Sequence, residues 1–256
     1  MTLLPQTPSL ATGPIGVFDS GLGGLSILRS LKVQLPGEDF VYFADSGHAP
    51  YGERADEFVL SRAQTVSESL LDQGCKALVV ACNTATAAAI QTLRQRWPRL
   101  PLIGVEPALK PAMNFSQTRH IAVLATRGTL QSQKFQTLLA QLPKDLVIKT
   151  QACDGLADAI ENFDDVKIQQ LSAHYLAACG PFGSSPDQVD TVVLGCTHYP
   201  LVLDTFKQQI EGVRFLDTGD AVARQTERLL KEQQLLKNGP PNGQTTWLSS
   251  GDKDQL

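Results

Sequence analysis

Two cysteines each stand where a short apolar run meets a group of polar residues. In "ALVVACNTATAAAI", Cys82 follows a strand-like run, and Asn83 and Thr84 come directly after it. In "VVLGCTHYPL", Cys196 occupies the matching place and is again followed by polar residues. A thiol at the end of a strand and the start of a helix lies near unpaired backbone N–H groups and the positive end of the helix dipole. Both are expected to favour the thiolate form.

Two thiols on opposite walls of a cleft suit the transfer of a proton from one face of a carbon atom to the other. That reaction needs a base on one side and an acid on the other, and a thiol pKa of about 8.5 allows both forms near working pH. A disulfide is the redox alternative, although no CxxC pair is present. Each cysteine taken alone could equally be a small buried hydrophobe, with Asn83 and Thr84 as helix caps or carboxylate ligands. The matching positions of Cys82 and Cys196 favour function.

Three further side chains could assist the thiols, and each has an ordinary structural alternative. Asp19 ends the first strand-like run, where it could instead cap the helix that follows the glycines. His198 lies two residues beyond Cys196 and could instead be a histidine satisfied by backbone. Glu161 lies on a helical pattern that begins near Cys153, and this pattern alone indicates an exposed surface residue.

The glycine-rich stretch "GVFDSGLGGLS" supports a competing hypothesis of nucleotide binding. A strand, a glycine turn and a helix precede Asp45, which ends the next strand and could contact a ribose. However, the third glycine of G-x-G-x-x-G is replaced by Ser26, and Asp19 would repel a pyrophosphate. Nucleotide binding is therefore the second-ranked hypothesis.

Short apolar runs alternate with amphipathic stretches along most of the chain. This alternation predicts an α/β fold with parallel sheets that helices cover on both faces. The predicted strands are 15–18, 40–44, 77–81, 101–105, 120–125, 146–150, 191–195 and 213–217. The predicted helices are 24–34, 54–73, 84–96, 130–141, 165–179 and 201–210.

A loose internal repeat predicts two similar doubly wound halves. "IGVFDSGLGG" has a counterpart in "IAVLATRGTL", and "VVACNTAT" in "VVLGCTHY". Because ligands of open α/β sheets bind beyond the carboxyl ends of the strands, we expect the active site in a cleft between the halves. The expected first domain is 14–106 plus a returning helix at about 218–236, the second is 107–217, and the ends 1–13 and 238–256 are expected to be loose.

The composition fits a soluble globular protein, since 42% of the 256 residues are hydrophobic and 19% are charged. A net charge of −4 without a basic run gives no reason to expect a nucleic-acid partner. Five irregularly spaced cysteines argue against a secreted disulfide framework. The four histidines have no metal-ligand spacing, and neither a signal peptide nor a membrane span is evident. We therefore expect a cytoplasmic protein.

Four stretches taken together resemble the aspartate/glutamate racemase family, and within it the cofactor-independent glutamate racemases. They are "GVFDSGLGGLS", "YFADSGHAPYG", "ACNTATA" and "LGCTHYPL", in that order, and the resemblance covers residues 14 to about 230. It implies two flavodoxin-like α/β domains with the active site between them. It also implies interconversion of L-glutamate and D-glutamate without pyridoxal phosphate or metal, in the supply of D-glutamate for bacterial peptidoglycan, and it is compatible with a homodimer.

The resemblance also assigns roles by motif. Cys82 would handle the proton of D-glutamate and Cys196 that of L-glutamate, Asp19 and His198 would assist them, and Glu161 would lie near the second thiol. The residues implied in substrate binding are Asp19, Ser20, Tyr51, Gly52, Asn83, Thr84, Thr197 and His198.

The chain departs from the family pattern in two places. Asp154 follows Cys153 where the family usually has proline, and Phe135 takes the aromatic place of a second-half pattern that usually ends in tyrosine. The alternatives that remain are a racemase for aspartate or another amino acid, and a nucleotide- or protein-binding module.

Overall fold

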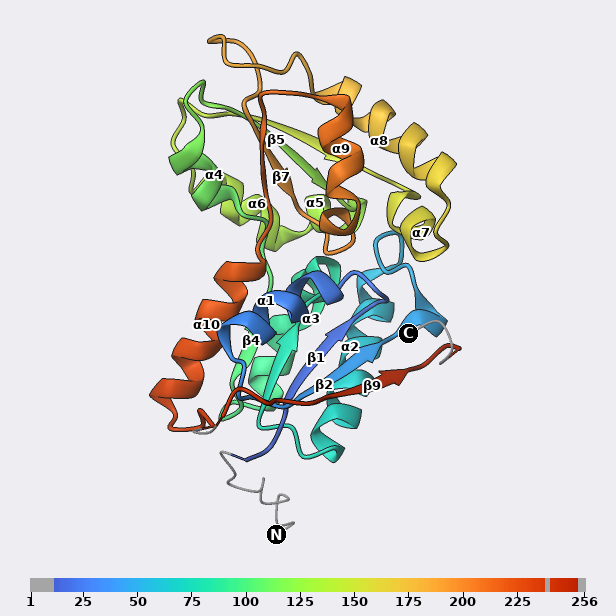
Figure 1. The fold of residues 1–256 in the computed structure, drawn as a ribbon, viewed down its shortest axis with the longest axis vertical. Coiled ribbons are helices and arrows are strands. Elements are labelled where there is room, and N and C mark those ends of the chain that lie inside the picture. The colour runs from blue at the N-terminus through green and yellow to red at the C-terminus, as the bar shows by residue number, and fades with distance from the viewer. Residues whose placement is uncertain (1–11, 238–239, 253–256) are drawn as a thin grey trace.

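The structure, a computed structural model, describes residues 12–237 and 240–252. The remaining residues, which include most of the N-terminal segment predicted to be loose, lie outside this description. Figure 1 shows two lobes, each built around its own sheet. No helix within the described ranges is both long and apolar enough to cross a membrane.

The first half contains a five-stranded parallel sheet in the order β4-β3-β1-β2-β9. Its elements in chain order are β1 (Ile15–Asp19), α1 (Leu25–Gln34), β2 (Phe40–Ala44), η1 (Ser46–His48), α2 (Asp56–Asp72), β3 (Ala77–Val80), α3 (Asn83–Arg96), β4 (Leu102–Gly104) and, after the second half, α10 (Gly219–Glu232) and β9 (Thr245–Ser249). All residues of β1 and β3 are buried, as expected of parallel strands covered on both faces.

The second half contains a four-stranded parallel sheet in the order β6-β5-β7-β8. Its elements are α4 (Leu109–Phe115), β5 (His120–Ala125), α5 (Arg127–Gln131), α6 (Gln133–Ala140), β6 (Val147–Ala152), α7 (Leu156–Glu161), α8 (Asp165–Cys179), β7 (Thr191–Leu194), η2 (Tyr199–Val202), α9 (Leu203–Gln209) and β8 (Arg214–Leu216). The order repeats that of the first half, with β5 and β7 in the places of β1 and β3, so the prediction of two similar doubly wound α/β halves is confirmed.

The returning helix α10 packs against α1 of the first half. Val222, Ala223 and Leu230 of α10 belong to the same apolar core as Leu28 and Leu31 of α1. Polar contacts flank this core, among them Ser30 Oγ to Asp220 Oδ1 at 3.2 Å and Gln34 Nε2 to Glu227 Oε2 at 2.7 Å. The helix that follows the second half is thereby fixed to the first half.

The expectation of a loose tail is wrong for residues 245–249. They form β9, which pairs in parallel with β2 at the edge of the first sheet. The tail is anchored on the way, because the N–H groups of Lys237 and Gln244 donate to Glu38 Oε1 at 2.7 Å and Asp39 Oδ1 at 2.8 Å. These contacts hold the segment before β9 against the residues that precede β2.

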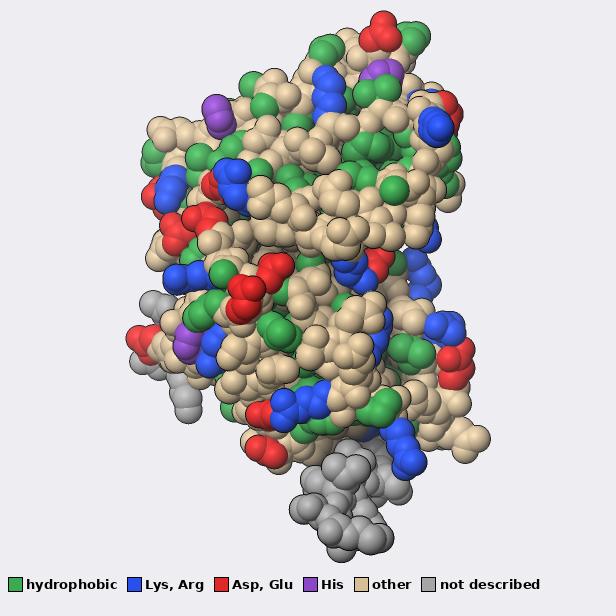
Figure 2. Space-filling view, turned by 180° about the vertical axis from the view of Figure 1, so that it is seen from behind, with side chains coloured by type: hydrophobic (Ala, Val, Ile, Leu, Met, Phe, Trp, Pro, Cys, Tyr) green, Lys and Arg blue, Asp and Glu red, His purple; other side chains and the backbone are tan. Residues whose placement is uncertain are grey.

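Figure 2 shows that basic and acidic side chains are interspersed on the face opposite to that of Figure 1.

The ion pair between Lys76 and Glu38 is buried in the interior. The Lys76 Nζ atom lies 2.6 Å from Glu38 Oε2, and both side chains are only 2% exposed. Breaking such a pair leaves an uncompensated charge in the interior.

We predict that Lys76→Ala lowers the free energy of unfolding by about 3–5 kcal/mol, because Glu38 then keeps a buried charge without its ammonium partner. Urea denaturation measures this change. The matched control is Lys237→Ala, whose side chain pairs with Asp39 at 2.7 Å but is 28% exposed. The control should cost less than about 1 kcal/mol, and equal losses for the two variants would contradict the prediction.

Candidate active site

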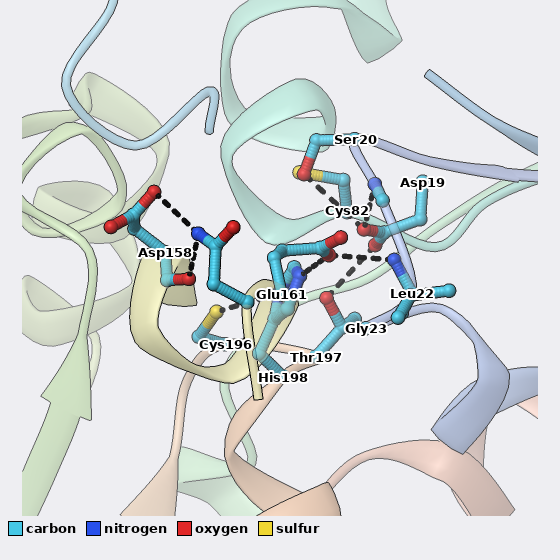
Figure 3. Close-up of polar contacts among 12 residues, drawn as sticks. Asp19, Ser20, Leu22, Gly23, Cys82, Asp158, Glu161, Cys196, Thr197 and His198 are labelled. Carbon is cyan, nitrogen blue, oxygen red and sulfur yellow. Dashed lines mark hydrogen bonds and ion pairs between the residues drawn. The ribbon is translucent and has the colours of Figure 1, made fainter. Parts of the chain in front are cut away.

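The carboxyl ends of three strands bring the predicted site residues together. Asp19 is the last residue of β1, Cys82 follows the adjacent β3, and Cys196 follows β7 of the second half. β1 and β3 meet where the strand order of the first sheet reverses, which is the ligand position in open α/β sheets. Figure 3 shows Cys82 and Cys196 approaching this region from separate halves, with Glu161 drawn between them.

Cys82 is itself the N-cap residue of α3. Its sulfur accepts a hydrogen bond from the Ala85 N–H at 3.4 Å and contacts Ser20 Oγ at 4.0 Å. Asn83 and Thr84 therefore do not cap this helix, because they lie inside its first turn.

The expectation that the helix start would make Cys82 a thiolate is wrong for this structure. The thiol is 5% exposed, and burial raises its pKa, to which Asp19 and Cys196 add by their charges. The Ala85 N–H bond lowers the pKa but does not compensate. Because a thiol with a raised pKa binds its proton more tightly than a free thiol, Cys82 rests as the protonated thiol near neutral pH.

Cys196 precedes the short helix η2 and faces a histidine. Its sulfur lies 3.6 Å from His198 Nδ1, and His198 Nε2 contacts a carboxylate oxygen of Glu161. Burial lowers the pKa of His198, but the hydrogen bonds to Cys196 and Glu161 outweigh burial, and the pKa is raised well above its ordinary value. Cys196, His198 and Glu161 thus form a connected series of thiol, imidazole and carboxylate.

Asp19 holds the first and second halves together at the site. Its carboxylate is fully buried and accepts hydrogen bonds from Thr197 Oγ1 at 2.8 Å, the Gly21 N–H at 3.1 Å and Ser20 Oγ at 3.3 Å. Burial raises the pKa of Asp19, and this effect exceeds the lowering by His198 and by the hydrogen bonds from Thr197 and Gly21. Asp19 does not cap α1, whose N-cap residue is Gly24.

Glu161 reaches across from α7 to the glycine loop. Its carboxylate accepts a hydrogen bond from the Leu22 N–H at 2.6 Å, in addition to its contact with His198. A Cβ atom at Gly21 would lie 2.0 Å from Glu161 Oε1, and one at Gly23 would lie 2.4 Å from His198 Nδ1. These glycines therefore permit close contact between the halves, and the loop is occupied by protein groups where the competing hypothesis needs phosphates.

The remaining predicted residues line the same boundary. Thr84 Oγ1 lies 2.9 Å from Thr126 Oγ1, and the Gly52 carbonyl accepts from the Gly128 N–H at 3.1 Å, so each contacts the second half. Asn83 is buried beside them. The Tyr51 hydroxyl, in contrast, donates to Asp45 of its own half.

Two contacts at this boundary have no counterpart in the sequence predictions. Ser26 Oγ donates to the Thr197 carbonyl at 2.9 Å, and Tyr42 OH donates to the Gly21 carbonyl at 2.7 Å. Ser26 replaces the third glycine of the nucleotide-binding pattern. This serine was the one sequence signal that could have pointed to a polar contact at this position. In the described part of the chain, no group of three or more His, Cys, Asp or Glu side chains is arranged to hold a metal ion.

Comparison with known proteins gives a family and several close relatives. The model of the family described as Asp/Glu/Hydantoin racemase matches residues 15–226. A glutamate racemase from Pseudomonas syringae pv. tomato is 45% identical over 239 residues, which are 92% of this chain and 85% of that protein.

Solved structures agree in fold over nearly the whole chain. The crystal structure of the glutamate racemase isoform RacE1 from Bacillus anthracis has a TM-score of 0.82 and 32% identity, covering 95% of this chain and 90% of that one. The glutamate racemase from Francisella tularensis, solved in complex with D-glutamate, has a TM-score of 0.80 and 26% identity, covering 96% and 91%.

We predict that Glu161→Gln lowers the pKa of His198, because the amide cannot stabilise the imidazolium as the carboxylate does. In the folded protein this pKa is raised, so the stabilisation is complete below the unfolded value of about 6.5 and is lost as pH rises through the folded value. NMR titration of the histidine ring and unfolding at several pH values measure both effects.

The matched control is Asp158→Asn on the same helix, whose carboxylate pairs with Lys167 at 3.1 Å. This variant should leave the His198 titration unchanged. An unchanged titration in Glu161→Gln as well would contradict the coupling.

Proposed function

The chain belongs to the Asp/Glu/hydantoin racemase family, and on that premise we propose that it interconverts L-glutamate and D-glutamate. The observation that carries the proposal is the pair of thiols. Cys82 and Cys196 follow equivalent strands of the two halves, and each is only 5% exposed at their boundary. Relatives with the same fold that act on or bind glutamate support the choice of substrate.

In the proposed reaction the two thiols act on opposite faces of the α-carbon. With D-glutamate, Cys82 as thiolate removes the α-proton, and the electron pair of the broken C–H bond stays on the carbon. The Cys196 thiol then donates its proton to the other face, which gives L-glutamate and a Cys196 thiolate. The reverse reaction exchanges these roles.

Each thiol has its own route for exchanging protons. On one side Cys82 contacts Ser20 Oγ at 4.0 Å, and Ser20 Oγ donates to Asp19 at 3.3 Å. Because Cys82 rests as a thiol, it has to lose a proton before it can act, and Asp19 is placed to accept that proton through Ser20. On the other side, His198 exchanges protons with Cys196 while Glu161 orients the imidazole.

Substrate entry requires the halves to separate at the site. The thiols are buried, Glu161 is hydrogen-bonded to the glycine loop of the other half, and the Asp19–Thr197 hydrogen bond also joins the two halves. A glutamate carboxylate can replace that of Glu161 as the acceptor of the Leu22 N–H. We propose that binding proceeds by this exchange.

The proposal extends to the setting of the reaction. The chemistry needs no cofactor, since thiols remove and return the proton directly. Its product would supply D-glutamate for peptidoglycan in the cytoplasm, and the family resemblance is compatible with a homodimer. Nucleotide binding receives no support, because Asp45 is fully buried and engaged by Arg62 and Tyr51.

We predict that either enantiomer of glutamate, incubated in heavy water without pyridoxal phosphate, yields product with deuterium at the α-carbon. Cys82→Ala and Cys196→Ala should each slow racemisation by about 10²–10⁴-fold, because each removes the acid or base of one face. Polarimetry and mass spectrometry measure both. The control Cys75→Ala, whose buried thiol precedes β3 at the end of the strand opposite to Cys82, should retain the rate. A strict requirement for pyridoxal phosphate would contradict the proposal.

We further predict a preference for glutamate over aspartate. The two substrates differ by one methylene, which changes kcat/KM by about 10–200-fold. Rates of racemisation for both amino acids at matched concentrations measure this ratio. A higher kcat/KM for aspartate would assign the enzyme to the alternative substrate of the family.

A further inference from the structure

The strand β9 ends beside the loop 45–52, which forms part of the site boundary. β9 runs along β2 in parallel, with Ser249 opposite Ala44 (Figure 1). The next residue, Ser250, therefore stands opposite Asp45, and its N–H donates to the Ala44 carbonyl at 3.1 Å. Ser250 is thus brought to the carboxyl end of the first sheet, the end at which Cys82 lies.

Ser250 contacts two residues of this loop. Its hydroxyl oxygen accepts from the Gly47 N–H at 3.2 Å and lies 3.5 Å from His48 Nδ1. The same His48 nitrogen lies 3.1 Å from Asp45 Oδ1, so His48 links Ser250 to the Asp45 carboxylate. The fit is close, because a Cβ atom at Gly47 would lie 2.7 Å from the Ser250 carbonyl oxygen.

Asp45 transmits this contact to Tyr51. The carboxylate is fully buried, accepts two hydrogen bonds from Arg62 at 2.9 and 2.8 Å, and accepts another from the Tyr51 hydroxyl. Tyr51 is 1% exposed and packs in the same apolar cluster as Cys82. A connected series therefore runs from Ser250 through His48 and Asp45 to Tyr51, which belongs to the apolar cluster that contains Cys82.

A second series runs parallel to the first. Trp247 of β9 stands opposite Tyr42, and their ring centroids are 5.7 Å apart. The Tyr42 hydroxyl donates to the Gly21 carbonyl at 2.7 Å, next to the residues that bind Asp19. Both series reach the Asp19 and Cys82 side of the site, whereas Cys196 is held by groups of the second half.

We propose that β9 and Ser250 are positioning elements for the Cys82 side of the reaction, acting through Asp45 and Tyr51. The inference rests on the proposed function, because only a reaction on two faces distinguishes the two thiols. Ser250 itself touches neither thiol in the contacts described above, and its effect is on the placement of the loop.

The test uses α-deuterated D-glutamate and α-deuterated L-glutamate with the full-length protein. The equilibrium constant between enantiomers is one, so a variant must change kcat/KM equally in both directions. The equilibrium constant places no such constraint on the isotope effects on kcat/KM, which can differ between the two directions. The isotope effect reports the Cys82 step with D-glutamate and the Cys196 step with L-glutamate.

We expect Ser250→Ala to lower kcat/KM by about threefold to tenfold, the order expected for loss of a hydrogen bond near a charged group. The isotope effect should rise with D-glutamate and fall with L-glutamate. Ser250→Thr, which keeps the hydroxyl, should restore both values. The control Thr246→Ala removes a hydroxyl from an exposed position of the same strand and should behave as the unaltered protein.

Unchanged kinetics in Ser250→Ala, or equal changes of the two isotope effects, would overturn the proposal. If Ser250→Ala does not fold, Tyr51→Phe interrupts the same series at Asp45 and must show the same asymmetry. Where both fold, combining them should add no further asymmetry, because they act in one series. Absence of racemisation by the unaltered protein would instead refute the proposed function, which separates the two failures.

Discussion

Close contact between the glycine loop and the second half is the constraint on which the site depends. Gly21 and Gly23 have no side chain, so Glu161 and His198 can reach the loop backbone. The same approach brings Asp19 within hydrogen-bond distance of Thr197. Without it the two sheets would present their strand ends to water, and the thiols would belong to separate surfaces. The reaction centre is therefore a property of the boundary between halves.

The fold is nearly symmetric, but the groups behind the two thiols are not. Cys82 is connected to a carboxylate through the hydroxyl of Ser20, which relays a proton without holding a stable charge. Cys196 faces His198, which can keep a proton of its own. Similar backbones thus place sulfur atoms in equivalent positions, while local side chains give the two thiols different hydrogen-bonding partners. In the proposed reaction these partners would store and release a proton in different ways.

The strands and thiols could be predicted from sequence because buried parallel strands are continuous apolar runs, and all eight predicted runs are strands. β9 was missed because it is an edge strand with partly exposed residues, and its sequence is not a continuous apolar run. "TTWLS" is nevertheless rich in residues that favour strands. The raised pKa of Cys82 depends on burial, and the direction of the Tyr51 hydroxyl depends on Asp45. Sequence spacing determines neither of them.

The first half is assembled from both ends of the chain, since α10 and β9 follow the second half. The second half is one continuous segment, from α4 to β8. The N-terminal domain of a protein usually folds first during synthesis on the ribosome. Here the second half is complete before the first half. The second sheet has all its strands while the first still lacks its edge strand and one covering helix. The nascent protein must keep that apolar surface from aggregation until its last residues emerge.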